Sequence, residues 1–205
     1  MPPVTRGFTG RRRPASRDGQ LPPGQHDVGG LWPVLTAEAE PHLREDQVEL
    51  TVAGLVASPT TWTLAELRAL PTSTYAGDIH CVTSWSKLGT RFTGVSLDVL
   101  LGAAGPLDEA RHVVAESVTG YTTNLPLADV TGSRAWVVWD HEGRPLPPEH
   151  GGPLRLLVPH LYFWKSAKWV SRLELTAVDR PGFWERNGYH DRGDPWLEQR
   201  YQGDA

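Results

Sequence analysis

The sequence predicts an α+β protein, with mixed β-sheets and a few short helices folded as a single domain. Its 205 residues suit one large domain. The 18 prolines and 21 glycines imply short elements joined by many turns, which favours a β-rich architecture over a helical bundle. Several segments rich in β-branched residues also alternate between apolar and polar side chains, which is the period of half-buried strands.

The expected strands follow one another along most of the chain. They are "QVELTVAGLV" from Gln47, "TSTYAGDIHCV", "RHVVAES", "AWVVWD", "GPLRLLVP" and "KWVSRLELTAV". Two short helices lie between them. "TLAELRALP" has Thr63 and Glu66 at the spacing of a capping box and is closed by Pro71. "SLDVLLGAAG", from Ser96, ends in glycine.

Both ends of the chain differ in composition from its middle. Residues 1–24 are rich in Pro, Gly and Arg and are expected to form an extended arm, so the folded domain is expected to span residues 25–205. The tail from Asp179 has few aliphatic residues but five aromatic ones. These are Phe183, Trp184, Tyr189, Trp196 and Tyr201, and they are expected to anchor the tail on a preformed surface.

Charge and cysteine content exclude several classes of function. The net charge of −4 and the pI near 6.0 do not favour binding to nucleic acid or to an anionic membrane. No apolar run approaches the roughly 20 residues that a membrane span needs, and no apolar stretch follows "RRRP" as an export signal would require. One cysteine excludes an internal disulfide and is compatible with a reducing compartment, so a cytoplasmic location is expected.

That cysteine, Cys81, stands in "DIHCVTSWSKLGT", at the end of an expected strand and before an expected glycine turn. Three interpretations are open. The thiol could be a small buried apolar group. It could be a nucleophile activated by His80, His112 or His150, although neighbouring residues on a strand point to opposite faces. It could also be a soft ligand to a soft metal, if a cofactor supplies the other donors.

Two further segments carry candidate functional residues. Arg155, Lys165 and Lys168 are three cations in the mostly apolar stretch "HGGPLRLLVPHLYFWKSAKW", where with Ser166 they could hold a phosphate, or simply lie at solvated strand ends. Tyr121 stands in "ESVTGYTTNLPL", which is expected to be a loop rich in Thr and Gly. Its hydroxyl could donate a hydrogen bond to a substrate oxygen or could lie at the surface.

Taken together, these segments resemble the molybdopterin domain of the sulfite oxidase family, and in particular its short bacterial members and the catalytic subunit of protein-methionine-sulfoxide reductase. The resemblance runs from about Leu21 to Tyr201. It is carried in order by "DIHCVTSWS", "FTGVSLDVLL", "GYTTNLPL", "GRPLPPEHGGPLRLLVPHLYFWKSAKW" and "GFWERNGYHDRGDPWLEQRY".

The resemblance implies a cofactor and a set of site residues. Cys81 matches the cysteine that coordinates molybdenum, with the pterin dithiolene supplying two more sulfurs, and Tyr121 matches an active-site tyrosine. The remaining matches are to residues that contact the pterin or its phosphate, which are Ser117, His150, Arg155, Ser166, Ala167 and Lys168, and Lys165 is expected to add charge to this set.

One departure bears on the substrate. Sulfite oxidases carry an arginine pair after the cysteine, whereas "CVTSWSK" offers only Lys87. The expected function is therefore transfer of an oxygen atom to or from a small or side-chain substrate by a molybdenum–molybdopterin enzyme, with sulfoxide or N-oxide reduction favoured over sulfite oxidation. An external haem or flavin protein would exchange the electrons. The alternatives are a cofactor-free binding module and a thiol-dependent enzyme on the same fold.

Overall fold

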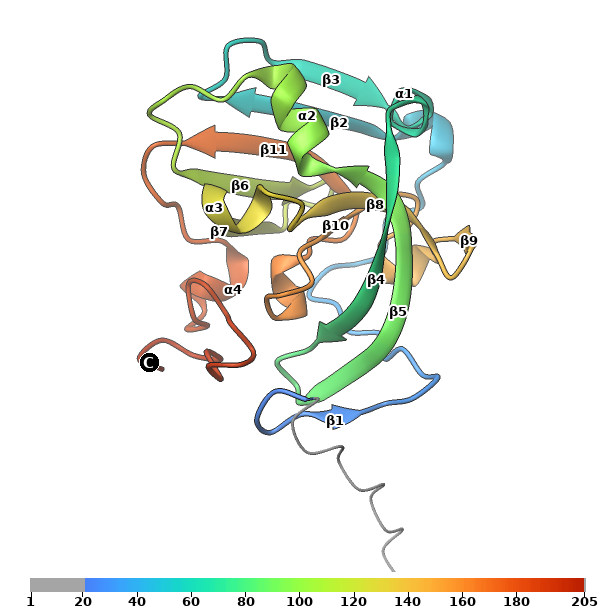
Figure 1. Cartoon of the computed structure of the whole chain (residues 1–205), viewed down its shortest axis with the longest axis vertical. Coiled ribbons are helices and arrows are strands. Elements are labelled where there is room, and N and C mark those ends of the chain that lie inside the picture. The colour runs from blue at the N-terminus through green and yellow to red at the C-terminus, as the bar shows by residue number, and fades with distance from the viewer. Residues whose placement is uncertain (1–20, 205) are drawn as a thin grey trace, which may run out of the picture.

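The structure, a computed structural model, describes residues 21–204 and consists of two mixed β-sheets with four short helices among these residues. The first sheet has the strand order β1–β5–β8–β10, with β4 paired to β5 and β9 to β8. Its strands are β1 (His26–Asp27), β4 (Thr72–His80), β5 (Trp85–Ser96), β8 (Trp136–His141), β9 (Arg144–Pro145) and β10 (Arg155–Leu157). β4 and β5 form a long curved hairpin down one side of the molecule (Figure 1).

The second sheet has the strand order β3–β2–β11–β6–β7. It contains β2 (Glu49–Gly54), β3 (Thr60–Thr63), β6 (His112–Ser117), β7 (Thr122–Pro126) and β11 (Val170–Thr176). β11 runs parallel to β2 and antiparallel to β6, so this sheet is mixed (Figure 1). The predicted fold class is therefore confirmed.

The helices are short, and the capping predicted for the first of them is present. They are α1 (Leu64–Ala69), α2 (Leu97–Ala104), α3 (Leu127–Val130) and α4 (Phe183–Arg186), with 3-10 turns η1 (Glu45–Gln47), η2 (Pro148–His150) and η3 (Phe163–Lys165). At the start of α1, the Thr63 hydroxyl accepts from the Glu66 amide, and the Glu66 carboxylate accepts from the Thr63 amide, as in a capping box. α2 begins after Ser96, whose hydroxyl accepts from the Asp98 amide, and it ends at Gly105, as its sequence predicts.

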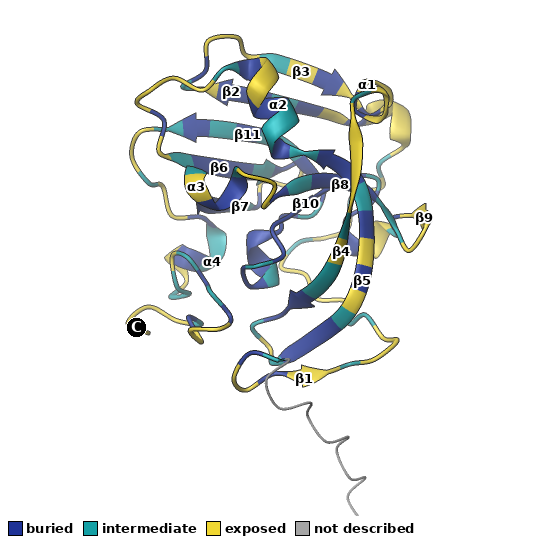
Figure 2. Ribbon diagram, viewed as in Figure 1, coloured by how far each residue is buried: buried dark blue, intermediate teal, exposed yellow. Residues whose placement is uncertain are grey.

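The larger hydrophobic core draws buried residues from both sheets, so the two sheets fold as one unit (Figure 2). β2, β6 and β11 turn alternate side chains such as Leu50, Val113 and Leu173 into this core. A smaller cluster containing Ile79 and Phe92 lies around Cys81. The cysteine thus begins a loop whose supporting strands are fixed by packing.

Two local expectations are wrong. Residues 122–126, expected as a loop after Tyr121, form strand β7, which pairs with β6. The glycine turn expected after Lys87 does not reverse the chain, because Gly89 lies within the twelve-residue strand β5. Its φ of +62° is a left-handed conformation that suits glycine inside an irregular, strongly bent strand.

The ends of the chain agree with expectation only in part. Most of the expected arm, residues 1–20, lies outside the described part of the chain, and Pro22 and Pro23 lead directly into β1. In the tail, Trp184 and Tyr189 pack against one another with ring centroids 4.8 Å apart, as expected for aromatic anchors. Trp196 and Tyr201 remain 51% and 54% exposed, although their rings still meet those of His80 and Tyr189 edge-on.

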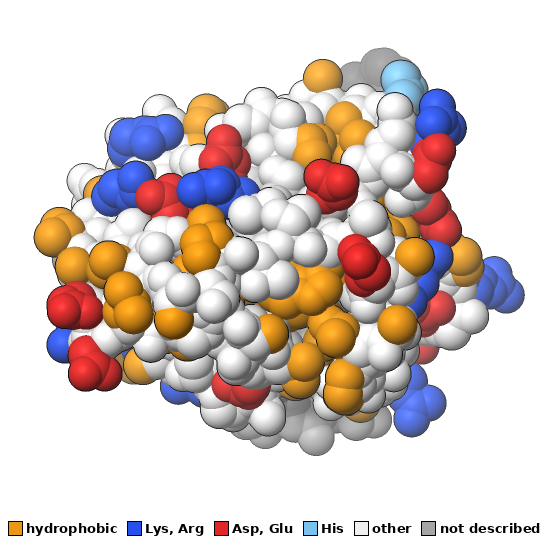
Figure 3. Space-filling view, turned by 90° about the horizontal axis from the view of Figure 1, so that it is seen from above, with side chains coloured by type: hydrophobic (Ala, Val, Ile, Leu, Met, Phe, Trp, Pro, Cys, Tyr) orange, Lys and Arg blue, Asp and Glu red, His pale blue; other side chains and the backbone are white. Residues whose placement is uncertain are grey.

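The described chain shows neither a membrane-crossing helix nor, on the face in Figure 3, a surface of one charge. No helix between residues 21 and 204 is long and apolar enough to span a bilayer. Acidic and basic side chains are interspersed on the face that Figure 3 displays. That face therefore lacks the continuous positive surface by which proteins attract nucleic acid.

Candidate active site

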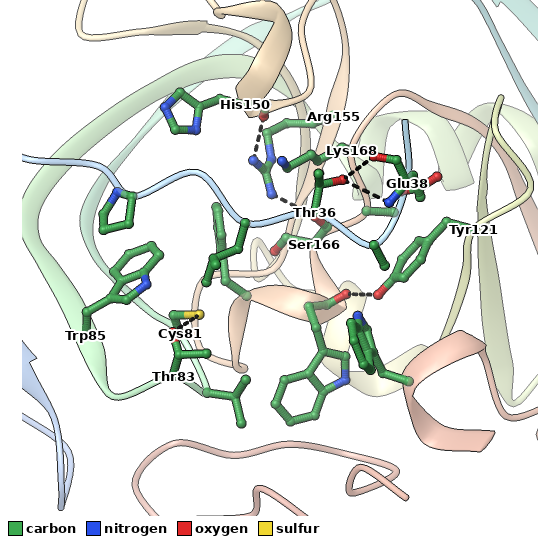
Figure 4. A pocket seen from close by; sticks show the side chains of 18 of the residues that line it. Thr36, Glu38, Cys81, Thr83, Trp85, Tyr121, His150, Arg155, Ser166 and Lys168 are labelled. Atoms are coloured by element: carbon green, nitrogen blue, oxygen red, sulfur yellow. Dashed lines mark hydrogen bonds between the residues drawn. The ribbon is translucent and has the colours of Figure 1, made fainter. Parts of the chain in front are cut away.

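Cys81 opens into a cavity of about 280 Å³ that holds most of the predicted site residues. Its wall is formed by the loop after β4, the turn between β6 and β7, η2 with the start of β10, and the stretch from η3 to β11. Residues 31–40, here called the N-terminal strap, cross the same cavity without regular secondary structure. Figure 4 shows Cys81, Thr83 and Trp85 at one end and the charged residues at the other.

At the sulfur end, Cys81 is nearly buried and is fixed mainly through its backbone. Its amide donates to the Trp85 carbonyl at 2.8 Å, and its carbonyl accepts from the Gln25 side chain at 3.0 Å. Among residues 21–204 the thiol has one hydrogen-bond partner, the Thr83 hydroxyl at 3.2 Å. Burial raises the pKa of the Cys81 thiol, and the hydrogen bond from Thr83 only partly opposes that rise.

No histidine activates this thiol. His80 is on the opposite face of the strand end, where its Nδ1 lies 2.7 Å from the Ser86 hydroxyl. His150 lines the same cavity as Cys81 but stacks on Trp32, with ring centroids 3.7 Å apart. Burial and the neighbouring cations lower the pKa of His150 to about 4, so its imidazole is neutral at pH 7.

At the charged end, Arg155 is a buried cation that lacks an acidic partner. The guanidinium donates to the carbonyls of His150 at 2.6 Å and Ser166 at 2.7 Å, and it lies 4.1 Å from the centroid of the Phe163 ring. No carboxylate in residues 21–204 forms an ion pair with it, and burial lowers the pKa of Arg155 to about 9. A cation in such a setting favours an anionic ligand.

Lys168 adds a second positive charge at this end. Its ammonium donates to the Glu149 carbonyl at 2.7 Å. Burial and the nearby Arg155 lower the pKa of Lys168 to about 8, so at pH 7 the amine is charged and responsive to an anion. Ser166 and Ala167 line the wall beside it, with the Ser166 hydroxyl held by the Val158 amide at 2.9 Å.

Three predicted site residues are placed differently from expectation. The Lys165 ammonium lies outside the cavity lining, 2.6 Å from Glu185 in a fully buried ion pair, so its expected contact with a phosphate is not supported. Ser117 does not line the cavity either, and its hydroxyl donates to the Glu38 carboxylate at 2.7 Å. Tyr121 does line it, but its hydroxyl donates to the Trp164 carbonyl at 2.7 Å.

Sequence reasoning missed Glu38, which the N-terminal strap brings to the cavity. Trp32 and Glu38 both line the cavity, and Glu38 faces the charged end near Lys168 (Figure 4). Partial burial raises the pKa of Glu38, although the hydrogen bond from Ser117 and the charge of Lys168 oppose that rise. No motif marks Glu38, because it reaches the site only through the tertiary path of the strap.

The cavity also contains an unpaired polar group that a ligand could satisfy. The indole Nε1 of Trp85 is buried and has no hydrogen-bond partner in the part of the chain that the structure describes. Native proteins rarely leave such a donor unpaired. Across residues 21–204, no three His, Cys, Asp or Glu side chains gather as a metal site, so Cys81 alone could not hold a metal without further donors.

Comparison with known families identifies the class of protein. A family model described as an oxidoreductase molybdopterin-binding domain matches residues 37–184. The chain therefore belongs to the molybdopterin-binding oxidoreductases of the sulfite oxidase family, and the predicted family is confirmed.

Individual relatives agree with this assignment. The uncharacterized oxidoreductase YuiH of Bacillus subtilis (strain 168) is 43% identical over 199 residues, covering 96% of this chain and all of YuiH. A putative protein-methionine-sulfoxide reductase subunit, YedZ1 of Azospira oryzae, is 30% identical over 141 residues, covering 69% of this chain. The match spans only 53% of that relative's length.

A solved structure shows the same fold. The sulfane dehydrogenase SoxCD from Paracoccus pantotrophus superposes with a TM-score of 0.63 at 24% identity. The match covers 68% of this chain and 41% of that one. At this identity the likeness establishes the fold alone.

Proposed function

We propose that the chain is a molybdenum-dependent oxidoreductase that transfers an oxygen atom, with Cys81 as the protein's ligand to the metal. The observation that carries the proposal is one cavity with the thiol of Cys81 at one end and, at the other, a buried guanidinium that has no carboxylate partner among residues 21–204. A molybdopterin cofactor has the matching groups, since a dithiolene supplies soft donors for the metal and a phosphate supplies the anion.

The sulfur end fits a metal whose other donors come from the cofactor. A thiolate is a soft ligand, and one protein sulfur suffices when two more are supplied. Coordination would also remove the thiol proton, which burial otherwise holds in place. When bound, the cofactor would supply two-electron oxygen-atom transfer at the metal.

The charged end fits the phosphate of the cofactor. We assign Arg155 and Lys168 as its cations, with Ser166 and Ala167 forming the wall beside them. His150 is neutral and stacked on Trp32, so it would offer a ring nitrogen and a flat surface to the pterin. The unpaired indole Nε1 of Trp85 would donate to a polar group of the ligand.

We propose that Ser117 and Tyr121 act indirectly, through hydrogen bonds to other residues that line the cavity. Ser117 orients the Glu38 carboxylate, which faces the cavity. Tyr121 fixes the backbone of Trp164 and keeps its own proton, because burial holds the pKa of its hydroxyl well above the usual range. Both residues therefore position the wall of the cavity, and turning the Tyr121 hydroxyl toward a substrate would first require breaking its bond to Trp164.

The chain's own residues favour a neutral oxygen-containing substrate over sulfite. The lining residues that follow Cys81 in sequence are Val82, Thr83 and Trp85, none of which is charged. The charge of Arg200 does act on the thiol, but its guanidinium lies outside the lining and donates to the Val82 carbonyl. Lys87, the nearest cation in sequence, is absent from the lining, and its ammonium points toward the Leu31 carbonyl at 3.5 Å. Sulfoxides and N-oxides need no cationic pocket, and reducing one consumes two electrons and two protons and releases water.

The electrons would come from an external protein. A single cysteine cannot ligate an iron–sulfur cluster, which requires several thiolates. A haem or flavin protein is the partner that we propose. We also propose the cytoplasm as the location, because a single free thiol is compatible with a reducing compartment.

The thiol-enzyme and binding-module alternatives are less well supported by the site. A nucleophilic Cys81 needs an adjacent base, and its one hydrogen-bond partner in the described chain is the Thr83 hydroxyl. A cofactor-free binding module would leave the buried charge of Arg155 without an anionic partner in the described chain.

A substrate screen tests the proposal. Protein from a host that makes the pterin would be assayed with reduced dye plus dimethyl sulfoxide or trimethylamine N-oxide, and separately with sulfite plus ferricyanide. We expect the first two reactions to proceed, and the Cys81→Ser variant to be folded and inactive in both. A fully active Cys81→Ser variant would remove the central assignment, whereas dominant sulfite oxidation would overturn only the substrate class.

A further inference from the structure

Trp164 is a residue of the cavity wall whose backbone and side chain are both held by hydrogen bonds. It lies in η3, and its side chain lines the same cavity as Cys81 while remaining only 9% exposed. Its backbone carbonyl accepts the Tyr121 hydroxyl at 2.7 Å. Its indole Nε1 donates to Oε1 of Glu185 at 3.0 Å. Both hydrogen bonds are buried, and the one from the indole to Glu185 fixes the orientation of the ring.

Packing around the ring restricts Trp164 further. Tyr162 stacks on it with centroids 5.3 Å apart, and Tyr189 meets it edge-on at 5.2 Å. Gly193 lies close against the ring, where a Cβ would come within 2.6 Å of the ring atom Cζ2. Its φ of +76° is also unfavourable for other residues. Little room remains for the indole to move.

Glu185 is a fully buried carboxylate whose charge is balanced by Lys165. Its carboxylate is fully inaccessible and accepts from the Trp164 indole and from the Thr123 hydroxyl at 3.1 Å. A lone buried carboxylate would be strongly destabilising, and Lys165, at 2.6 Å, balances its charge. Lys165 also donates to the Asn124 carbonyl at 2.8 Å, which ties the pair to β7.

We propose that Trp164 is a specificity-determining residue that limits the size of the group reaching Cys81, and that Glu185 is the positioning residue that fixes it. Glu185, Tyr189 and Gly193 all lie beyond residue 184, where the family match ends. The C-terminal segment therefore supplies three of the residues that fix the wall, in addition to Tyr121 and Tyr162. For turnover this inference rests on the proposed function, but the wall itself does not depend on a bound cofactor.

The single cysteine allows the wall to be tested without knowing the substrate. In the full-length chain prepared from a host that lacks the pterin, every maleimide adduct reports on Cys81. The quantity to measure is the ratio of the alkylation rate with N-phenylmaleimide to that with N-ethylmaleimide. Two double variants isolate the role of Glu185. Lys165→Met with Glu185→Leu removes the acceptor of the Trp164 indole, whereas Lys165→Met with Glu185→Gln keeps an acceptor oxygen there.

We expect the ratio to rise about tenfold in the Leu-containing pair, the factor that one lost hydrogen bond represents. The Gln-containing pair should stay close to wild type, and Trp164→Leu should give the largest rise. Glu174→Gln, which removes a surface ion pair with Arg180, is the matched control and should change nothing.

Two results would overturn the inference. The first is an alkylation-rate ratio equal to that of the wild type in the Lys165→Met, Glu185→Leu variant, provided that this variant unfolds cooperatively and is therefore folded. The second is an alkylation-rate ratio equal to that of the wild type in Trp164→Leu. This result would overturn the inference even if the double variant does not fold. In molybdenum-loaded enzyme, Trp164→Leu should lower the KM for methyl phenyl sulfoxide relative to dimethyl sulfoxide at constant molybdenum content. Absence of molybdenum in the wild type would refute the proposed function and leave the alkylation result standing.

Discussion

Replacing Arg155 by Met should abolish phosphate binding while changing the stability of the ligand-free protein only modestly. The lowering of the Arg155 pKa to about 9 corresponds to a penalty on the buried charge on the order of 5 kcal/mol. Met removes that penalty. It also leaves the carbonyls of His150, Leu156 and Ser166 without the guanidinium donors, at about 1–3 kcal/mol each. The two effects are similar in size and opposite in sign, so they largely cancel.

Phosphate should no longer raise the stability of the protein when Arg155 is replaced by Met. If inorganic phosphate binds the wild type with a dissociation constant of about 1 mM, 10 mM phosphate adds about 1.4 kcal/mol of stability. For a chain of this size that raises the Tm by about 3–6 °C. Thermal unfolding of the cofactor-free chain with and without phosphate is the assay, and Arg180→Met, at an exposed ion pair, is the control. An unchanged phosphate shift in Arg155→Met would refute the assignment of the phosphate site.

Three further predictions concern other parts of the molecule. The phosphate-induced rise in Tm should fall as pH increases through about 8, because Lys168 then loses its charge, and Lys168→Met should lack this pH dependence. Lys165→Met should retain molybdenum but lose about 3–5 kcal/mol of stability in urea unfolding, because the Glu185 carboxylate is left buried without its cation. Loss of molybdenum from this variant would instead indicate that Lys165 binds the cofactor. Thr63→Ala should cost about 1 kcal/mol through loss of the α1 cap, with no change in phosphate binding.

Local sequence signals predicted the parts of the fold that depend on neighbouring residues. The capping box of α1 and the alternation of β2 and β11 were visible because their residues are close in sequence. The strand β7 was missed because "TTNLP" lacks a long apolar alternation, and its pairing with β6 stabilises it instead. The middle of β5 was read as a turn because Gly89 is a common turn residue.

The site residues also fall into those that the local sequence predicted and those whose position depends on the tertiary structure. Arg155, Ser166 and Lys168 stand in one short stretch and converge on the cavity, as their spacing suggested. Lys165 belongs to the same stretch, but its side chain points to the other side, where a carboxylate twenty residues further on neutralises it. Glu38 could not be predicted, since its place in the cavity depends on the path of the strap through the folded molecule.

The most direct test of the account is the molybdenum content of purified protein from a pterin-producing host, measured for wild type and Cys81→Ala together. We predict close to one molybdenum per chain in the wild type. In Cys81→Ala we expect a large loss of molybdenum and unfolding behaviour similar to that of the wild type. A folded wild type without molybdenum, or a Cys81→Ala variant with a full complement, would contradict the assignment of Cys81 as the metal ligand.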